Sequence, residues 1–165
     1  MIILVSDTSV LIDLEKGGLL EAIFTSGLTF VVPDYLYDKE LKDSNGPYLC
    51  SLGLGVLELS PQELEAVQEL KMGSKGLSTP DCFALICAQR QNHKLITSDG
   101  LLRKVAKSKK VDVYGLFWLM DSLEIAGISY TLLHEALQKI SNDVKCRLPK
   151  DEINTRLNKW LIHQQ

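Results

Sequence analysis

The sequence has no hydrophobic run long enough to cross a membrane. No apolar stretch in its 165 residues reaches the roughly 18 to 20 residues that a transmembrane helix requires. Asp7 soon interrupts the apolar start at residues 1–5, whereas a secretion signal would need a basic start and a longer apolar stretch. We therefore expect a cytoplasmic protein with no membrane partner.

Cysteine is present, but without the spacing of a zinc site. None of the four cysteines belongs to a C-x-x-C pair, and the three histidines do not cluster with them. We therefore expect these side chains to be small buried hydrophobic groups. The four are Cys50, Cys82, Cys87 and Cys146.

Strong positive charge and the common nucleophile motifs are also missing. The net charge of −3 argues against a protein that coats nucleic acid. A nuclease remains compatible with it, because an acidic metal pocket lowers the net charge while a local basic strip holds the substrate. The sequence contains no G-x-S-x-G, no phosphate-binding loop and no cysteine paired with a nearby histidine.

What is present is a regular alternation of expected strands and helices. Short apolar runs predict strands at residues 2–6, 28–32, 54–59, 94–97 and 111–114. Helices are expected at residues 33–41, after 60, after 78, after 101, and at 116–126, 131–140 and 150–162, with a loop at 45–47. This order predicts an α/β fold, a central parallel sheet flanked by helices on both faces. We expect one domain over residues 1–140 and a C-terminal helical appendage, residues 141–165, packed on it.

Four acidic residues stand at or near places where this fold binds ligands. Asp7 follows the first expected strand and Asp99 the fourth, and ligands bind beyond the carboxyl ends of parallel strands. Asp81 lies in the first turn of a helix, and Glu40 lies on the helix after the second strand. Helix capping also explains Asp81 and Asp99, and solvation explains Glu40. Asp7 is different, because a carboxylate directly after a buried strand is partly desolvated and needs a partner.

Carboxylate and water oxygens are the ligands that Mg²⁺ and Mn²⁺ prefer. Without a cation, clustered acids would repel one another and raise each other's pKa. With one or two ions bound, such a cluster activates water and stabilises an in-line phosphoryl displacement. The pattern therefore favours a metal-dependent phosphodiester hydrolase.

Three segments resemble motifs of the PIN (PilT N-terminal) domain family, in register over about residues 1–120. They are Asp-Thr-Ser-Val-Leu-Ile at 7–12, Ser-Thr-Pro-Asp-Cys-Phe-Ala-Leu at 78–85 and Ile-Thr-Ser-Asp-Gly-Leu-Leu at 96–102. The resemblance implies a PIN-like fold and metal binding by Asp7, Asp81 and Asp99. Many members are RNA-cleaving toxins of VapC type with a protein antitoxin, and members often pair as dimers. It thus implies an endoribonuclease with Mg²⁺ or Mn²⁺, an RNA substrate, an antitoxin partner and a homodimer.

The second acidic motif of the family fits less well. The family usually carries a glutamate on the helix after the second strand, often as Glu-Leu, and Glu40-Leu41 matches this. Counted from Pro33 without a gap, however, Lys39 takes the expected position, flanked by Asp38 and Glu40. Because residues two apart lie about 200° apart around an α-helix, only one of these acids can face the site. We prefer Glu40 and keep Asp38 as its rival.

Polar and basic residues near these acids have two interpretations each. Hydroxyls beside the acids either orient the carboxylates and hold metal-bound water, or cap helices. The cations that follow Asp99 either contact RNA phosphates or form a solvated helix end. The hydroxyls are Thr8, Ser9 and Ser98, and the cations are Arg103, Lys104 and Lys107.

Two other readings compete with a ribonuclease. The first is a PIN-like module that has lost catalysis and serves in RNA binding or complex formation. The second is another α/β phosphoryl-transfer protein. A haloacid-dehalogenase-like phosphatase would need an acid at position 9, which is a serine, and a receiver domain would need a lysine that residues 97–99 do not offer.

Overall fold

The computed structural model describes residues 1–162 and contains a five-stranded sheet in the order β3-β2-β1-β4-β5. All four strand pairings are parallel. The chain moves outward from β1 to β3, then returns to the other side of β1 with β4. The strand order therefore reverses between β1 and β4, the place where open α/β sheets bind ligands. The strands are β1 (Ile3–Ser6), β2 (Thr29–Pro33), β3 (Gly55–Leu57), β4 (His93–Ile96) and β5 (Val113–Tyr114).

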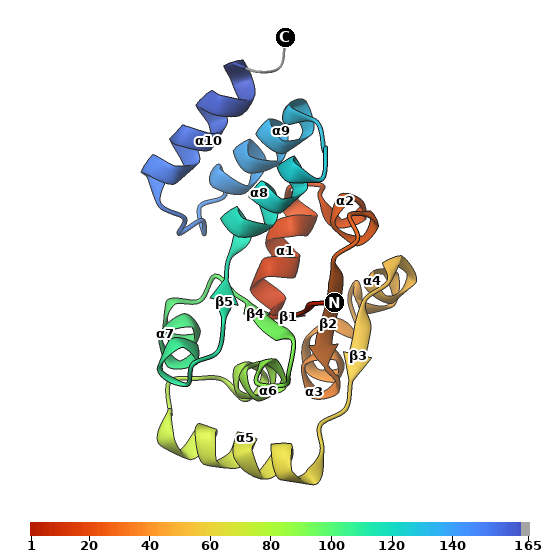
Figure 1. Cartoon of the computed structure of the whole chain (residues 1–165), viewed down its shortest axis with the longest axis vertical. Coiled ribbons are helices and arrows are strands. Elements are labelled where there is room, and N and C mark those ends of the chain that lie inside the picture. The colour runs from red at the N-terminus through yellow and green to blue at the C-terminus, as the bar shows by residue number, and fades with distance from the viewer. Residues whose placement is uncertain (163–165) are drawn as a thin grey trace.

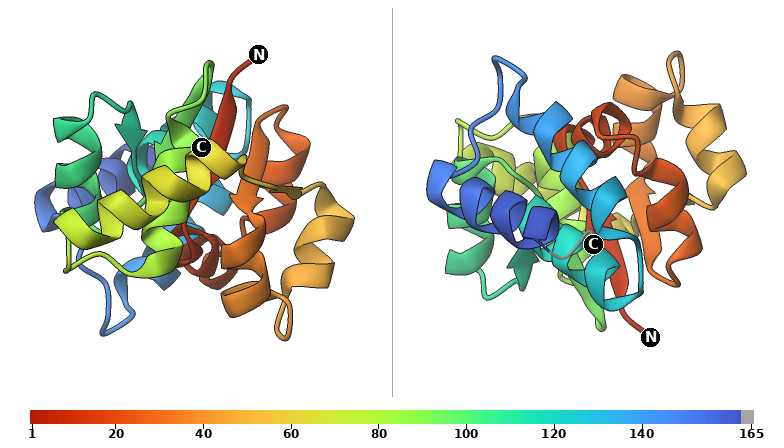
Figure 2. Two further views of the ribbon diagram at one scale, coloured as in Figure 1. Left: turned by 90° about the horizontal axis from the view of Figure 1, so that it is seen from below. Right: turned by 90° about the horizontal axis from the view of Figure 1, so that it is seen from above.

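Helices cover both faces of this sheet, as Figure 1 shows, which confirms the expected α/β architecture. α6 packs against β1, β2 and β4, and α5 crosses outside α6 (Figure 2, left). α1, α8 and α9 lie on the opposite side of the sheet (Figure 1). The helices are α1 (Thr8–Lys16), α2 (Leu20–Thr25), α3 (Asp34–Leu36), η1 (Tyr37–Leu41), α4 (Gly46–Leu52), α5 (Pro61–Gly73), α6 (Thr79–Ala88), α7 (Gly100–Ser108), α8 (Leu116–Ile125), α9 (Tyr130–Ser141) and α10 (Lys150–Ile162).

Most boundaries agree with the sequence prediction to within a few residues, and the helices predicted after residues 60 and 78 both begin at capping serines. Ser60 and Glu63 form a complete capping box at α5, and Ser78 caps α6. The loop expected at residues 45–47 was wrong, because α4 begins there. Pro47 occupies the first turn of that helix, where a missing N–H costs nothing.

The cysteine prediction is half right. Cys82 and Cys87 are fully buried on α6, whereas Cys146 is half-buried and Cys50 is exposed on α4. Cys50 lies on the solvent-facing side of α4, a helix that the sequence analysis did not predict. No helix within residues 1–162 is long and apolar enough to span a membrane.

The last helix packs on the rest of the molecule. α10 lies beside α9, as both Figure 1 and the right view of Figure 2 show. Ile153 and Trp160 are buried in the common core, and Leu157 is half-buried, whereas Leu161 is exposed. The apolar side of this helix therefore serves core packing.

Candidate metal centre

Asp7 is the most enclosed acid of the predicted site. It directly follows β1, is 4% exposed and caps the N-terminus of α1. Its Oδ1 accepts from the backbone N–H of Val10 at 3.1 Å, and the Ser9 hydroxyl lies 2.9 Å from both carboxylate oxygens. Its backbone N–H donates to the Ile96 carbonyl at 3.1 Å, which joins the ends of β1 and β4. The strand order thus places Asp7 at the switch point of the sheet.

Thr97 is the residue that sequence reasoning missed. Its side chain is fully buried, and its hydroxyl donates to Asp7 Oδ2. The hydroxyl oxygen of Thr97 also accepts from the backbone N–H of Asp99 at 3.0 Å. Thr97 therefore links the two predicted metal ligands that follow β1 and β4. Its place inside the Ile-Thr-Ser-Asp motif was a signal, but its partner Asp7 is ninety positions away in the chain.

The other two aspartates lie at helix starts near Asp7. Asp81 is half-buried in the first turn of α6, where its backbone N–H donates to the Ser78 hydroxyl at 3.2 Å. Asp99 is exposed and caps α7, accepting from the backbone N–H of Leu101 at 3.3 Å. The capping roles expected for Asp81 and Asp99 are thus present, and they do not conflict with a role in metal binding.

Burial and mutual repulsion act together on these carboxyl groups. Burial raises the pKa of Asp7 from 3.8 to about 6, against the hydrogen bonds from Thr97, Val10 and Ser9, and the charge of Asp81 raises it further. Burial also raises the pKa of Asp81, and the charge of Asp99 adds to it, while hydrogen bonding to Ser78 and the charge of Lys71 oppose it. Asp7, Asp81 and Asp99 therefore form an electrostatically connected chain.

A π-helix occupies the segment of the uncertain fourth acid. η1 spans Tyr37–Leu41, and the N–H of Lys42 donates to the carbonyl of Tyr37 at 2.8 Å, five residues back. A π-turn holds one residue more than an α-turn, which accounts for the one-residue offset of Glu40 in the motif. The wider π-turn changes the angle expected between Asp38 and Glu40, but residues two apart still lie on nearly opposite sides of the helix. Both side chains are exposed.

The acids have the chemistry of a hard-cation site, but they do not converge on one point. Within residues 1–162, no three Asp, Glu, His or Cys side chains lie close enough together to hold a metal ion. No hydrogen bond or ion pair in that part of the chain joins Glu40 to the three aspartates. Burial, with a smaller contribution from repulsion, raises these pKa values, and a divalent cation would oppose both effects. Carboxylates are the ligands that Mg²⁺ and Mn²⁺ take. The donor set therefore fits such an ion.

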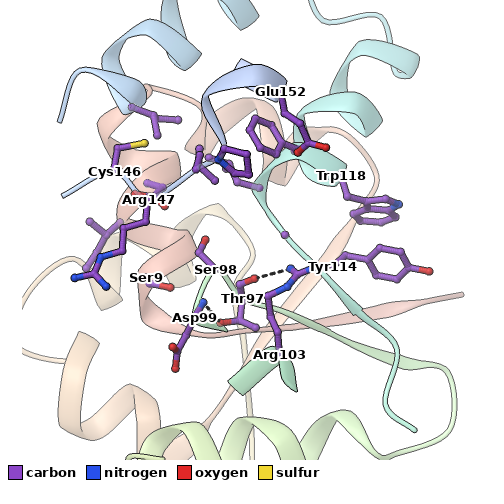
Figure 3. Close-up of a pocket in the computed structure, with 18 of the residues that line it drawn as sticks. Ser9, Thr97, Ser98, Asp99, Arg103, Tyr114, Trp118, Cys146, Arg147 and Glu152 are labelled. Carbon is purple, nitrogen blue, oxygen red and sulfur yellow. Dashed lines mark hydrogen bonds between the residues drawn. The ribbon is translucent and has the colours of Figure 1, made fainter. Parts of the chain in front are cut away.

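The flanking residues divide into those that contact the acids and those that do not. Ser9 contacts Asp7, whereas Ser98 is exposed and makes no side-chain hydrogen bond in the described part of the chain. The Thr8 hydroxyl is buried and has no hydrogen-bond partner within residues 1–162. A cavity of about 820 Å³ lies beside Asp99 and is lined by Ser9, Thr97, Ser98 and Arg103 among others (Figure 3).

The three predicted substrate cations are placed differently from one another. Arg103 lines this cavity, and its Nη1 donates to the Thr97 carbonyl at 3.1 Å. Lys104 and Lys107 are exposed on α7 and are not part of the cavity wall. Of the three, only Arg103 is fixed beside the acids.

Comparison with known families agrees with this arrangement. The family model DUF3368, described as a PIN domain, matches residues 3–161. No curated protein and no solved structure matches the chain. PIN domains are generally nucleases, and they typically use divalent metal ions. The match covers nearly the whole chain, including α10, so the chain belongs to the PIN domain family.

Proposed function

We propose that the protein is an endoribonuclease that hydrolyses RNA phosphodiester bonds with Mg²⁺ or Mn²⁺. In this proposal Asp7, Asp81, Asp99 and Glu40 hold the metal. The observation that carries it is the buried carboxylate of Asp7 at the switch point of the sheet, electrostatically coupled to Asp81 and through it to Asp99. Carboxylates whose charges raise one another's pKa are costly unless they serve a cation.

The chain's own residues have distinct parts in this scheme. Ser9 and Thr97 fix the orientation of the Asp7 carboxylate, and Thr97 also fixes the backbone of Asp99. Asp81 and Asp99 are accessible enough for their side chains to turn toward Asp7. When bound, the metal supplies activated water and stabilises charge on the phosphoryl group. Arg103, beside Asp99, is placed to bind a substrate phosphate.

Further parts of the proposal come from the family resemblance. The protein acts in the cytoplasm, forms a homodimer and is the toxin of a toxin–antitoxin pair, held inactive by a protein antitoxin. Co-purification from cells that carry the flanking genes tests the antitoxin, and the mass of the purified protein in solution tests the dimer.

Cleavage of RNA by purified protein with Mn²⁺ tests the main proposal. We expect Asp7→Asn and Asp99→Asn to reduce the cleavage rate by at least about a hundredfold, because each removes a charged metal ligand. Asp43→Asn, an exposed acid outside the site, controls for the change in net charge. Full activity in folded Asp7→Asn protein would refute the proposal.

One observation favours a second candidate, a PIN-like module without catalysis. Within residues 1–162, no three acidic, histidine or cysteine side chains lie close enough together to hold an ion. Titration with Mn²⁺ separates the two candidates. A degenerate module would bind the ion weakly and cleave no RNA, whereas the nuclease would bind it in a manner that Asp7→Asn abolishes.

A further inference from the structure

The side chain of Asn45 makes an unexpected contact just after the turn that carries Glu40. Asn45 is the N-cap residue of α4, which begins at Gly46. Asparagine is favoured at this position because its side chain accepts a hydrogen bond from the first turn of the helix. Asn45 forms no such cap, although its side chain is half-buried. Its amide therefore serves a contact other than local capping.

That contact joins the start of α4 to α1. Asn45 Nδ2 donates to Glu15 Oε2 at 2.7 Å, between residues thirty positions apart in the chain. α1 begins directly after Asp7, and the inward side of this helix is buried in the core. Glu15 is therefore carried at a set place relative to Asp7. The hydrogen bond ties the chain that follows Glu40 to the helix that Asp7 caps.

The chain that precedes Glu40 is tied to α6. The rings of Tyr35 on α3 and Phe83 on α6 are stacked, with centroids 4.5 Å apart and planes inclined by 11°. Phe83 is buried and lies two residues after Asp81 on the same helix. Aromatic pairs of this kind stabilise a contact beyond the area they bury. The segment with Glu40 is thus attached on one side to the helix of Asp81 and on the other to α1.

Lys39, in the middle of η1, is also held by this stack. Its Nζ lies 5.7 Å from the centroid of the Tyr35 ring, within the range of a cation–π contact. Successive residues of a helix point in different directions, so Glu40 does not share this contact. The Glu40 carboxylate is exposed and has no hydrogen bond or ion pair within residues 1–162. The backbone of the turn is therefore restrained, while its acid remains uncommitted.

We propose that Asn45 is a positioning residue for the metal site: through Glu15 it holds η1 in the orientation from which Glu40 serves the ion, a role that rests on the proposed function. Mg²⁺ requires its oxygen ligands in nearly ideal geometry, so a carboxylate supplied from a separate turn loses its value when that turn moves. A purely structural contact would instead stabilise α4 and leave the affinity for the ion unchanged.

An exchange of charge tests the contact without removing the helix cap. Asn45→Asp places a second carboxylate beside that of Glu15, and the two repel, while aspartate is as good an N-cap as asparagine. We expect this variant to bind Mn²⁺ at least about threefold more weakly, as measured by electron paramagnetic resonance of the free ion. Adding Glu15→Gln should restore the affinity to within about twofold of the wild type, because the new amide can donate to the new carboxylate.

A double-mutant cycle shows whether Asn45 acts through Glu40. Glu40→Gln should itself weaken Mn²⁺ binding, and Asn45→Asp should cause no further loss in that protein. Tyr48→Phe is the matched control, because the Tyr48 hydroxyl on α4 donates at 3.4 Å to Glu21 of α2, a helix without any acid of the site. This variant should bind Mn²⁺ like the wild type. An equal loss on Asn45→Asp with and without Glu40 would overturn the positioning role.

The outcomes separate this role from the proposed function, provided that circular dichroism shows each variant folded. Metal-dependent cleavage by a protein in which Asn45→Asp leaves Mn²⁺ affinity unchanged would support the nuclease and overturn the positioning role. A loss of affinity that Glu15→Gln restores, in a protein that cleaves no RNA, would support the positioning role and refute the nuclease. A wild type that binds no Mn²⁺ would overturn both.

Discussion

The carboxylate of Asp7 is kept out of water by the fold, at a cost in free energy. Removing an ionised group from water is costly, and here Thr97, Ser9 and the N–H of Val10 offset part of that cost. They do not offset all of it, because the pKa of Asp7 still rises to about 6. When no cation is present, the remaining cost lowers the free energy of unfolding. A functional site of this kind is expected to reduce stability locally.

This cost makes Asp7→Asn a stabilising change in the metal-free protein. The folded state holds a proton on Asp7 up to about pH 6, while the unfolded state releases it near pH 3.8. The free energy of unfolding of the wild type should therefore fall as pH rises from about 4 to 6. Above pH 6, Asp7→Asn should be more stable by about 1 to 2 kcal/mol, since lost hydrogen bonds cancel part of the gain.

Urea unfolding in EDTA at several pH values measures this difference. Asp43→Asn, an exposed acid, serves as the control for net charge. A stability difference between Asp7→Asn and wild type that stays constant from pH 4 to 7 would contradict the prediction. Added Mn²⁺ should stabilise the wild type and leave the variant unchanged.

At the scale of elements, η1 depends on the helix that follows it. Gly46, the first residue of α4, lies directly against the end of η1. A Cβ at this position would lie 2.5 Å from the Leu41 carbonyl oxygen and 2.8 Å from the Tyr37 ring. The absence of a side chain at Gly46 therefore allows α4 to pack where it does, and the turn that carries Glu40 is fixed by that packing.

Gly46→Ala should destabilise the protein and displace η1. The new Cβ would clash with backbone atoms, which cannot move without displacing η1. We therefore expect the free energy of unfolding to fall by about 1 to 3 kcal/mol. Gly73→Ala is the matched control, because nothing lies within 4 Å of a Cβ there. Thermal unfolding measures both, and RNA cleavage per folded molecule should fall only in Gly46→Ala. Equal stability of the two variants would show that Gly46 is not tightly packed.

Local sequence patterns predict some of these features, whereas others depend on contacts between distant segments. The strands, the caps at Ser60 and Ser78 and the strand-end positions of Asp7 and Asp99 follow from local patterns, so they were predictable. The role of Thr97 depends on the pairing of β1 with β4, which no local pattern specifies. No local pattern specifies the π-helix at residues 37–41, so the one-residue offset of Glu40 looked like a mismatch.

At the scale of the whole molecule, the C-terminal segment and the acidic site share one structure. Trp160 of α10 is fully buried in the same core cluster as Leu4 and Val5 of β1. Lys159 adds an ion pair to Glu124 of α8, with Nζ and Oε1 2.8 Å apart. The segment that joins α9 to α10, residues 142–149, is tied to α1 by the ion pair between Lys16 and Asp143. We therefore expect α10 to unfold together with the sheet that carries Asp7.

Substitution of Trp160 tests this cooperativity. Trp160→Ala should lower the free energy of unfolding by about 3 to 5 kcal/mol, because it leaves a large cavity. Trp160→Phe should cost less, because it fills most of the space and removes an indole N–H that has no partner within residues 1–162. In the Trp160→Phe protein, fluorescence reports on Trp118 alone, beside the cavity, while circular dichroism reports on all helices. The two signals should follow one unfolding transition. Two separate transitions would instead divide the chain into an independent domain and an appendage.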